Sequence, residues 1–211
     1  MAFVVRRRIP RALANCATQR AAEGLLSGMM DARFEVRYEC ARALEKVTIA
    51  NPTIAIPREK AVAAILNEVD KQAESRAATE FDADQDVPTA AGDLLADDRV
   101  DRTLEHVFTI LSLYLEREPL RMAFRALHHE DEHHRGTALE YLETVLSGEV
   151  RDAIWPLLGE AGPLAPGRPA EEILAELTAA TTEPARAVER PAPLADGDGR
   201  SATTPLRGAS S

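Results

Sequence analysis

The sequence predicts an all-α fold in which helical hairpins stack into a solenoid. Apolar residues recur at spacings of three and four, most clearly in two adjacent faces between Ala21 and Thr48. Aromatic residues make up only 4% of the chain while Ala, Leu and Arg are abundant, which favours closely packed helices. The pattern at Arg6 recurs at Arg37 and Arg135. A repeat of about 31 residues is typical of stacked helical pairs.

The composition of the chain argues against several classes of function and location. The formal net charge of −10 argues against a general nucleic-acid binder, because phosphate neutralisation needs a basic surface. Both cysteines, Cys16 and Cys40, fall on apolar stripes, and we expect buried, reduced thiols in a cytoplasmic protein. The longest apolar run, 107–115, is far shorter than the ~20 residues of a membrane span. The arginines of segment 1–10 follow a very short apolar run, unlike a secretory signal.

The first expected helix covers residues 2–15. Pro10 removes a backbone hydrogen bond, so we expect a bend there or a helix that effectively starts near Arg8. This end of the chain is locally basic. The basic residues indicate either a solvated helix face or a contact with an anionic partner. The arginines concerned are Arg6, Arg7, Arg8 and Arg11.

The next hairpin covers residues 21–48. We expect Asp31 to cap its second helix and Phe34 to form an aromatic plug between the two helices. Each helix keeps an apolar flank after pairing, so the hairpin must stack on other helices. The two apolar faces are Leu25, Leu26, Met29 and Met30, then Val36, Cys40, Ala43, Leu44 and Val47.

Pro57 opens a helix to about Arg76, whose period includes Ile65 and Glu68. The helical pattern then dissolves over 77–98, where carboxylates crowd. Alternating acids from Asp82 suggest a calcium loop, but its sixth and twelfth positions hold Val87 and Asp93 instead of Gly and Glu. We therefore expect a flexible acidic insertion at 77–98.

Three further helices are expected at 100–116, 119–128 and 135–146. The first is the most apolar and should be the most central, with His106 as a partly buried side chain that has one hydrogen-bond partner. A last helix at 149–158, with the single Trp155, caps the open end of the stack. Residues 159–211 read as a Pro/Ala-rich, mostly disordered tail with a short amphipathic helix at 168–179 that folds back or recruits a partner.

One string requires a choice between an enzyme and a scaffold. Residues His129 to His133 read His-Glu-Asp-Glu-His, and on a helix this spacing holds zinc. Here Asp131 and Glu132 fill positions that are uncharged in zinc proteases, and the repeat pattern places the string at a turn between helices. We therefore expect a polar turn, with adventitious metal affinity as the alternative and no metal site.

The shared template resembles the HEAT repeat in its short bacterial form. A turn Asp, then Val-Arg, then a small residue and Leu recur, and the resemblance implies ties of Arg37 to Asp31 and of Arg135 to Asp131. The segment from Arg117 to Leu146 is similar to HEAT segments at the C-terminus of some bacterial membrane-transporter-like proteins. The resemblance implies a HEAT-type α-solenoid of about three and a half hairpins over 2–158. The first repeat lacks its first helix, which exposes an apolar face.

From these observations we expect a non-catalytic scaffold that binds a protein partner and needs no cofactor. The alternatives are a regulatory appendage of a membrane transporter with peripheral membrane contact, and an enzyme like the phycobilisome lyases. Alkylpurine DNA glycosylases share the fold, but the acidic balance argues against that activity. Oligomerisation stays open. The expected docking residues lie on the first helix: Val5, Arg6, Arg7, Arg8, Ile9 and Arg11.

Overall fold

The described part of the computed structural model, residues 3–83, 90–129, 131–159 and 168–182, is all-helical and contains no strand. None of its helices combines the length and the apolar character that crossing a membrane requires. The elements are α1 (Phe3–Leu13), α2 (Gln19–Gly28), α3 (Phe34–Ala50), α4 (Arg58–Ala83), α5 (Ala90–Leu111), α6 (Arg117–Leu127), α7 (Glu132–Val145), α8 (Gly148–Ile154), the 3-10 helix η1 (Trp155–Leu158) and α9 (Ala170–Thr182).

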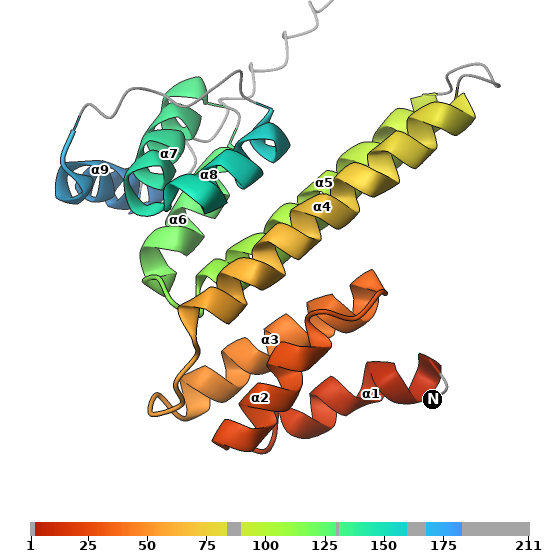
Figure 1. Ribbon diagram of the computed structural model, residues 1–211. Coiled ribbons are helices and arrows are strands. Elements are labelled where there is room, and N and C mark those ends of the chain that lie inside the picture. The colour runs from red at the N-terminus through yellow and green to blue at the C-terminus, as the bar shows by residue number, and fades with distance from the viewer. Residues whose placement is uncertain (1–2, 84–89, 130, 160–167, 183–211) are drawn as a thin grey trace, which may run out of the picture.

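Helices α4 and α5 form a long antiparallel hairpin at the centre, with α1–α3 on one side and α6–α9 on the other (Figure 1). Helix α1 packs mainly on α3, α3 packs on α5, and α5 contacts α6. Helix α8 lies on α4, while α9 packs on α6 and α7. Most contacts therefore join helices that are close in the sequence.

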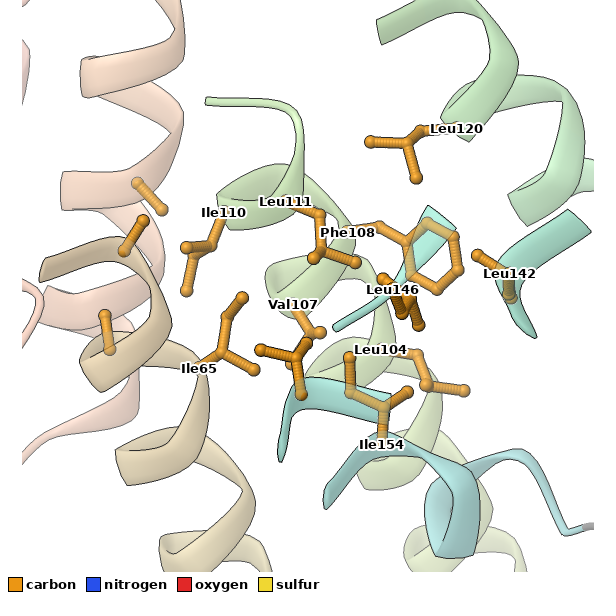
Figure 2. Packing of buried hydrophobic residues seen from close by; sticks show 14 of the residues in the cluster. Ile65, Leu104, Val107, Phe108, Ile110, Leu111, Leu120, Leu142, Leu146 and Ile154 are labelled. Atoms are coloured by element: carbon orange, nitrogen blue, oxygen red, sulfur yellow. The ribbon is translucent and has the colours of Figure 1, made fainter. Parts of the chain in front are cut away.

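The core confirms that α5 is central. Its side chains point to both sides: Val107 and Ile110 face Ile65 of α4, and Leu104 and Phe108 face α7 and α8 (Figure 2). Burial of such side chains contributes about 1.5–3 kcal/mol each. On the α7 and α8 side the contacting residues include Leu142 and Ile154, both fully buried.

The expected break in the helical pattern over 77–98 is wrong for its described residues, 77–83 and 90–98, which are helical. Helix α4 continues to Ala83 and α5 already begins at Ala90, while 84–89 lie outside the described residues. The two helices are paired on either side of this segment. Arg99 Nη1 of α5 donates to Ser75 Oγ of α4 at 3.2 Å, and Thr103 Oγ1 lies 3.4 Å from Gln72 Oε1. The expected tail beyond 182 also lies outside the described residues.

Of the two alternatives expected at Pro10, the start near Arg8 is wrong, because helix α1 starts at Phe3 and runs through Pro10. Three other local expectations also need correction. Asp31 orders the turn before α3 by accepting from Arg33 N at 3.0 Å, and the N-cap residue of α3 is Arg33.

Phe34 packs against His106 of α5, with ring centroids 5.7 Å apart, and so is not a plug between α2 and α3. Cys16 is exposed because α1 ends before it.

Cys40 is buried as expected, and it touches the end of α2. Burial raises the pKa of its thiol to about 12, so the sulfur stays protonated at neutral pH. A Cβ added at Gly28 would overlap Cys40 Sγ, so only glycine allows α2 and α3 to approach this closely.

We therefore expect Gly28→Ala to reduce the free energy of unfolding by about 1–3 kcal/mol through overpacking. Urea denaturation measures this loss. Gly136→Ala is the matched control, because no atom lies within 4 Å of its added Cβ and alanine favours the helix of α7. Combining Gly28→Ala with Cys40→Ala should recover most of the loss. An unchanged stability in Gly28→Ala alone would contradict the close packing of α2 on α3.

Candidate functional site

A buried ionic cluster joins α3, α4 and α5. Arg37 Nε and Nη2 donate to the two carboxylate oxygens of Glu68, at 2.6 and 3.0 Å. Arg37 Nη1 donates to the backbone carbonyls of Asp31 and Ala32, at 3.0 and 3.1 Å. His106 Nε2 of α5 lies 3.3 Å from Glu68 Oε2, although neither ring nitrogen has a well-aligned hydrogen bond. The three side chains are at most 4% exposed, so the cluster clamps three helices together.

The charge on Glu68 is stabilised despite its burial. Burial alone raises the pKa of this carboxyl, but the close contacts with His106 and Arg37 outweigh burial and hold the pKa below its ordinary value. Glu68 is therefore a carboxylate at neutral pH, and both of its oxygens are engaged.

This lowered pKa predicts a pH-dependent stability. A carboxyl whose pKa is lower in the folded state stabilises the fold above its unfolded pKa of about 4.3, and that contribution is lost as the pH falls through the folded pKa. We expect the difference in unfolding free energy between wild type and Glu68→Gln to be largest near pH 7 and to narrow below about pH 4. Urea denaturation at several pH values measures it. A difference that stays constant down to pH 3 would contradict the lowered pKa.

A cavity of about 280 Å³ opens above the cluster, between the start of α3, the middle of α4 and the middle of α5. The buried floor is polar because Arg37, Glu68, Gln72 and Thr103 contribute to it. The full lining is Ala32, Phe34, Glu35, Arg37, Glu68, Lys71, Gln72, Ser75, Arg99, Arg102 and Thr103.

The rim of the cavity is basic and held in place by local contacts. The guanidinium of Arg102 lies 4.9 Å from the centre of the Phe34 ring, a cation–π distance. Arg99 is held by its bond to Ser75, and Lys71 Nζ lies 2.8 Å from the exposed carboxylate of Glu74. The arrangement can attract an anion to a pocket whose floor carries further donors.

The docking residues expected from the sequence lie on α1, away from this cavity. Arg8, Ile9 and Arg11 are exposed, and Ile9 is 38% accessible. Arg11 Nε lies 3.7 Å from Glu39 of α3. The side chains of the other expected residues, Val5, Arg6 and Arg7, lie outside the described part of the structure.

The His129–His133 string lies at the turn between α6 and α7, as expected. Helix α6 ends at Leu127 and α7 begins at Glu132, so the two histidines do not share a helix face. Asp131 caps α7 by accepting from His133 N at 2.9 Å. Within residues 3–83, 90–129, 131–159 and 168–182, no three or more His, Cys, Asp or Glu side chains are grouped so that they could hold a metal.

The two arginines of the repeat template differ from the expected ties. Arg37 reaches Asp31 through its backbone carbonyl, whereas its carboxylate partner is Glu68. Arg135 Nη2 donates to the carbonyl of Leu158 at 2.8 Å, which joins α7 to η1. The sequence analysis did not predict Glu68 as a site residue. The clue that could have revealed it is the position of this carboxylate on the apolar stripe of α4.

His106 is also more deeply buried than expected, at 1% exposure. It packs on the rings of Phe34 and Tyr38, with centroid distances of 5.7 and 5.9 Å.

Comparison of the chain with protein-family models, with curated proteins and with solved structures gives no match.

Proposed function

We propose that the chain is a non-catalytic scaffold of HEAT type that binds a protein partner through its N-terminal edge. The observation that carries the proposal is that most helices pack on near neighbours in the sequence, α1 on α3, α3 on α5, α5 on α6 and α7 on α9, while α8 also lies on α4. Stacked helical layers of this kind offer extended surfaces for binding a partner. Two unpaired cysteines, Cys16 and Cys40, fit a cytoplasmic location.

The non-catalytic part of the proposal is supported by the state of Glu68. A general base needs a pKa near the working pH and a free lone pair directed at substrate. Glu68 has a lowered pKa and both oxygens on Arg37, so the cluster serves to hold three helices. A rigid platform of this kind is what a binding surface needs.

The docking surface we propose is the outer face of α1. Helix α1 packs on α3 and more weakly on α2, and Arg8, Ile9 and Arg11 remain exposed. An apolar side chain between two arginines is a composition that protein interfaces favour at their centre.

The test is capture of a partner from the native host with the full chain as bait. We expect a partner that wild type captures stoichiometrically to be lost with Ile9→Asp. The matched control is Ile49→Asp, because Ile49 is more exposed, at 57%, and lies at the end of α3. Equal loss with both variants, or capture that Ile9→Asp leaves unchanged, would contradict docking through α1.

A membrane-transporter appendage is the second candidate, favoured by the exposure of Arg8 and Arg11 beside Ile9. Basic side chains near an anionic bilayer contribute about 1 kcal/mol each. We expect this candidate to show co-sedimentation with phosphatidylserine vesicles that Arg8→Glu with Arg11→Glu abolishes. Absence of co-sedimentation at low salt would contradict the proposal of a membrane-transporter appendage.

A further inference from the structure

We infer that the cavity between α3, α4 and α5 is a binding site for a small, multiply charged oxyanion that carries phosphate or carboxylate groups. The first argument is charge. Four cationic side chains, Arg37, Lys71, Arg99 and Arg102, line the cavity beside two carboxylates, Glu35 and Glu68. The chain as a whole has a net charge of −10, so a basic pocket is a local departure from its composition.

The second argument is a buried arginine that lines the cavity. Arg37 is engaged through Nε, Nη1 and one bond from Nη2, but Nη2 carries a second N–H with no acceptor among the described residues. Its side chain is 4% exposed and lines the cavity. A buried donor without an acceptor is costly, and an anion in the cavity would supply the acceptor.

The third argument is the amide of Gln72. This residue is 8% exposed and lines the cavity, and its Oε1 lies 3.4 Å from Thr103 Oγ1. Its Nε2 has no acceptor within the described residues. Gln72 and Arg37 therefore bring neutral and charged donors, from α4 and α3, to one polar floor.

The fourth argument is the rim. Arg99 and Arg102 form no ion pair with any described residue, and both are exposed. Each guanidinium is nevertheless held in place, Arg99 by Ser75 and Arg102 by the Phe34 ring. Guanidinium groups bind phosphate and carboxylate in a bidentate manner, and preordering them lowers the entropic cost of that bond.

The size of the cavity selects a compact ligand. About 280 Å³ is at the small end of the range for small-molecule sites. A ligand with two charged groups can engage the rim arginines with one group and the floor donors with the other. Pyrophosphate and citrate represent the two chemistries at this size.

The inference goes beyond the proposed scaffold function and is tested separately, by calorimetric titration of the purified full chain at fixed ionic strength in magnesium-free buffer. We expect pyrophosphate, citrate or both to saturate one site with Kd below ~1 mM. The pyrophosphate and citrate arms distinguish phosphate from carboxylate recognition. Arg99→Gln and Arg102→Gln should each weaken binding about tenfold, because each removes a charge-assisted contact. Ile9→Asp should leave it unchanged.

Arg125→Gln is the matched control. Arg125 is an exposed arginine that lines a separate cavity of about 250 Å³ beside α6, so its removal changes the net charge equally. We expect less than a twofold effect. The inference is overturned if neither anion saturates a site, or if Arg125→Gln weakens binding as much as the rim variants. Circular dichroism confirms that each variant keeps its helical content.

Discussion

Glu68→Gln is expected to lower the free energy of unfolding by about 3–5 kcal/mol, because it leaves the guanidinium of Arg37 buried without a countercharge. The substitution keeps the shape of the side chain, so little of the loss can come from a new void. Arg37 is 4% exposed, so bulk water can solvate little of its charge. Urea denaturation at pH 7 measures the loss.

The control is the double variant Arg37→Met with Glu68→Met. Replacing both members of a buried ion pair with apolar side chains of similar volume is often neutral or stabilising. We expect the double variant to be at least 2 kcal/mol more stable than Glu68→Gln. Similar destabilisation in both would mean that hydrogen bonds to the turn at Asp31 and Ala32, and not the charge pair, dominate the cluster.

Leu111→Ala is expected to cost about 2–5 kcal/mol, through lost burial and the cavity left behind. Leu111 is the last residue of α5, is fully buried and lies beside Phe108 in the core (Figure 2). The end of α5 meets α6 there, so the surrounding helices cannot collapse freely onto the void. Thermal or urea unfolding measures the change.

Ile49→Ala is the control for this prediction, since Ile49 is 57% exposed at the end of α3. A surface substitution of this kind changes stability by about 0.5 kcal/mol or less. If Leu111→Ala were equally mild, the packing of α5 against α6 would not be the core of the fold.

The sequence predicts a helix well where the helix has its own regular apolar spacing. It predicts the ends of a helix less well where pairing with another helix accompanies a longer span. The hairpin at 21–48, the central α5 and the short helix before Thr182 all follow from spacing. The extension of α4 to Ala83 does not follow from spacing, because the acidic segment has no clear apolar period, although α4 pairs with α5. The pattern of a single sequence does not indicate which other helix will pack against a segment.

The candidate site was predictable only in part, for the same reason. Arg37 stood out through the repeat template, but the template assigned it to Asp31, six residues away. Its carboxylate partner, Glu68, lies 31 residues away on another helix. The only trace in the sequence was a carboxylate on an apolar stripe. The basic rim needs three helices to assemble, so no local motif indicates it.

The most direct test of the scaffold function is site-specific photo-crosslinking in the native host. Benzoylphenylalanine replaces Arg8 on the outer face of α1 in one variant and Lys46, an exposed residue of α3, in the other. We expect a single crosslinked protein partner from position 8 and none from position 46. Crosslinks from position 46 but not from position 8, or none from either, would contradict docking through the N-terminal edge.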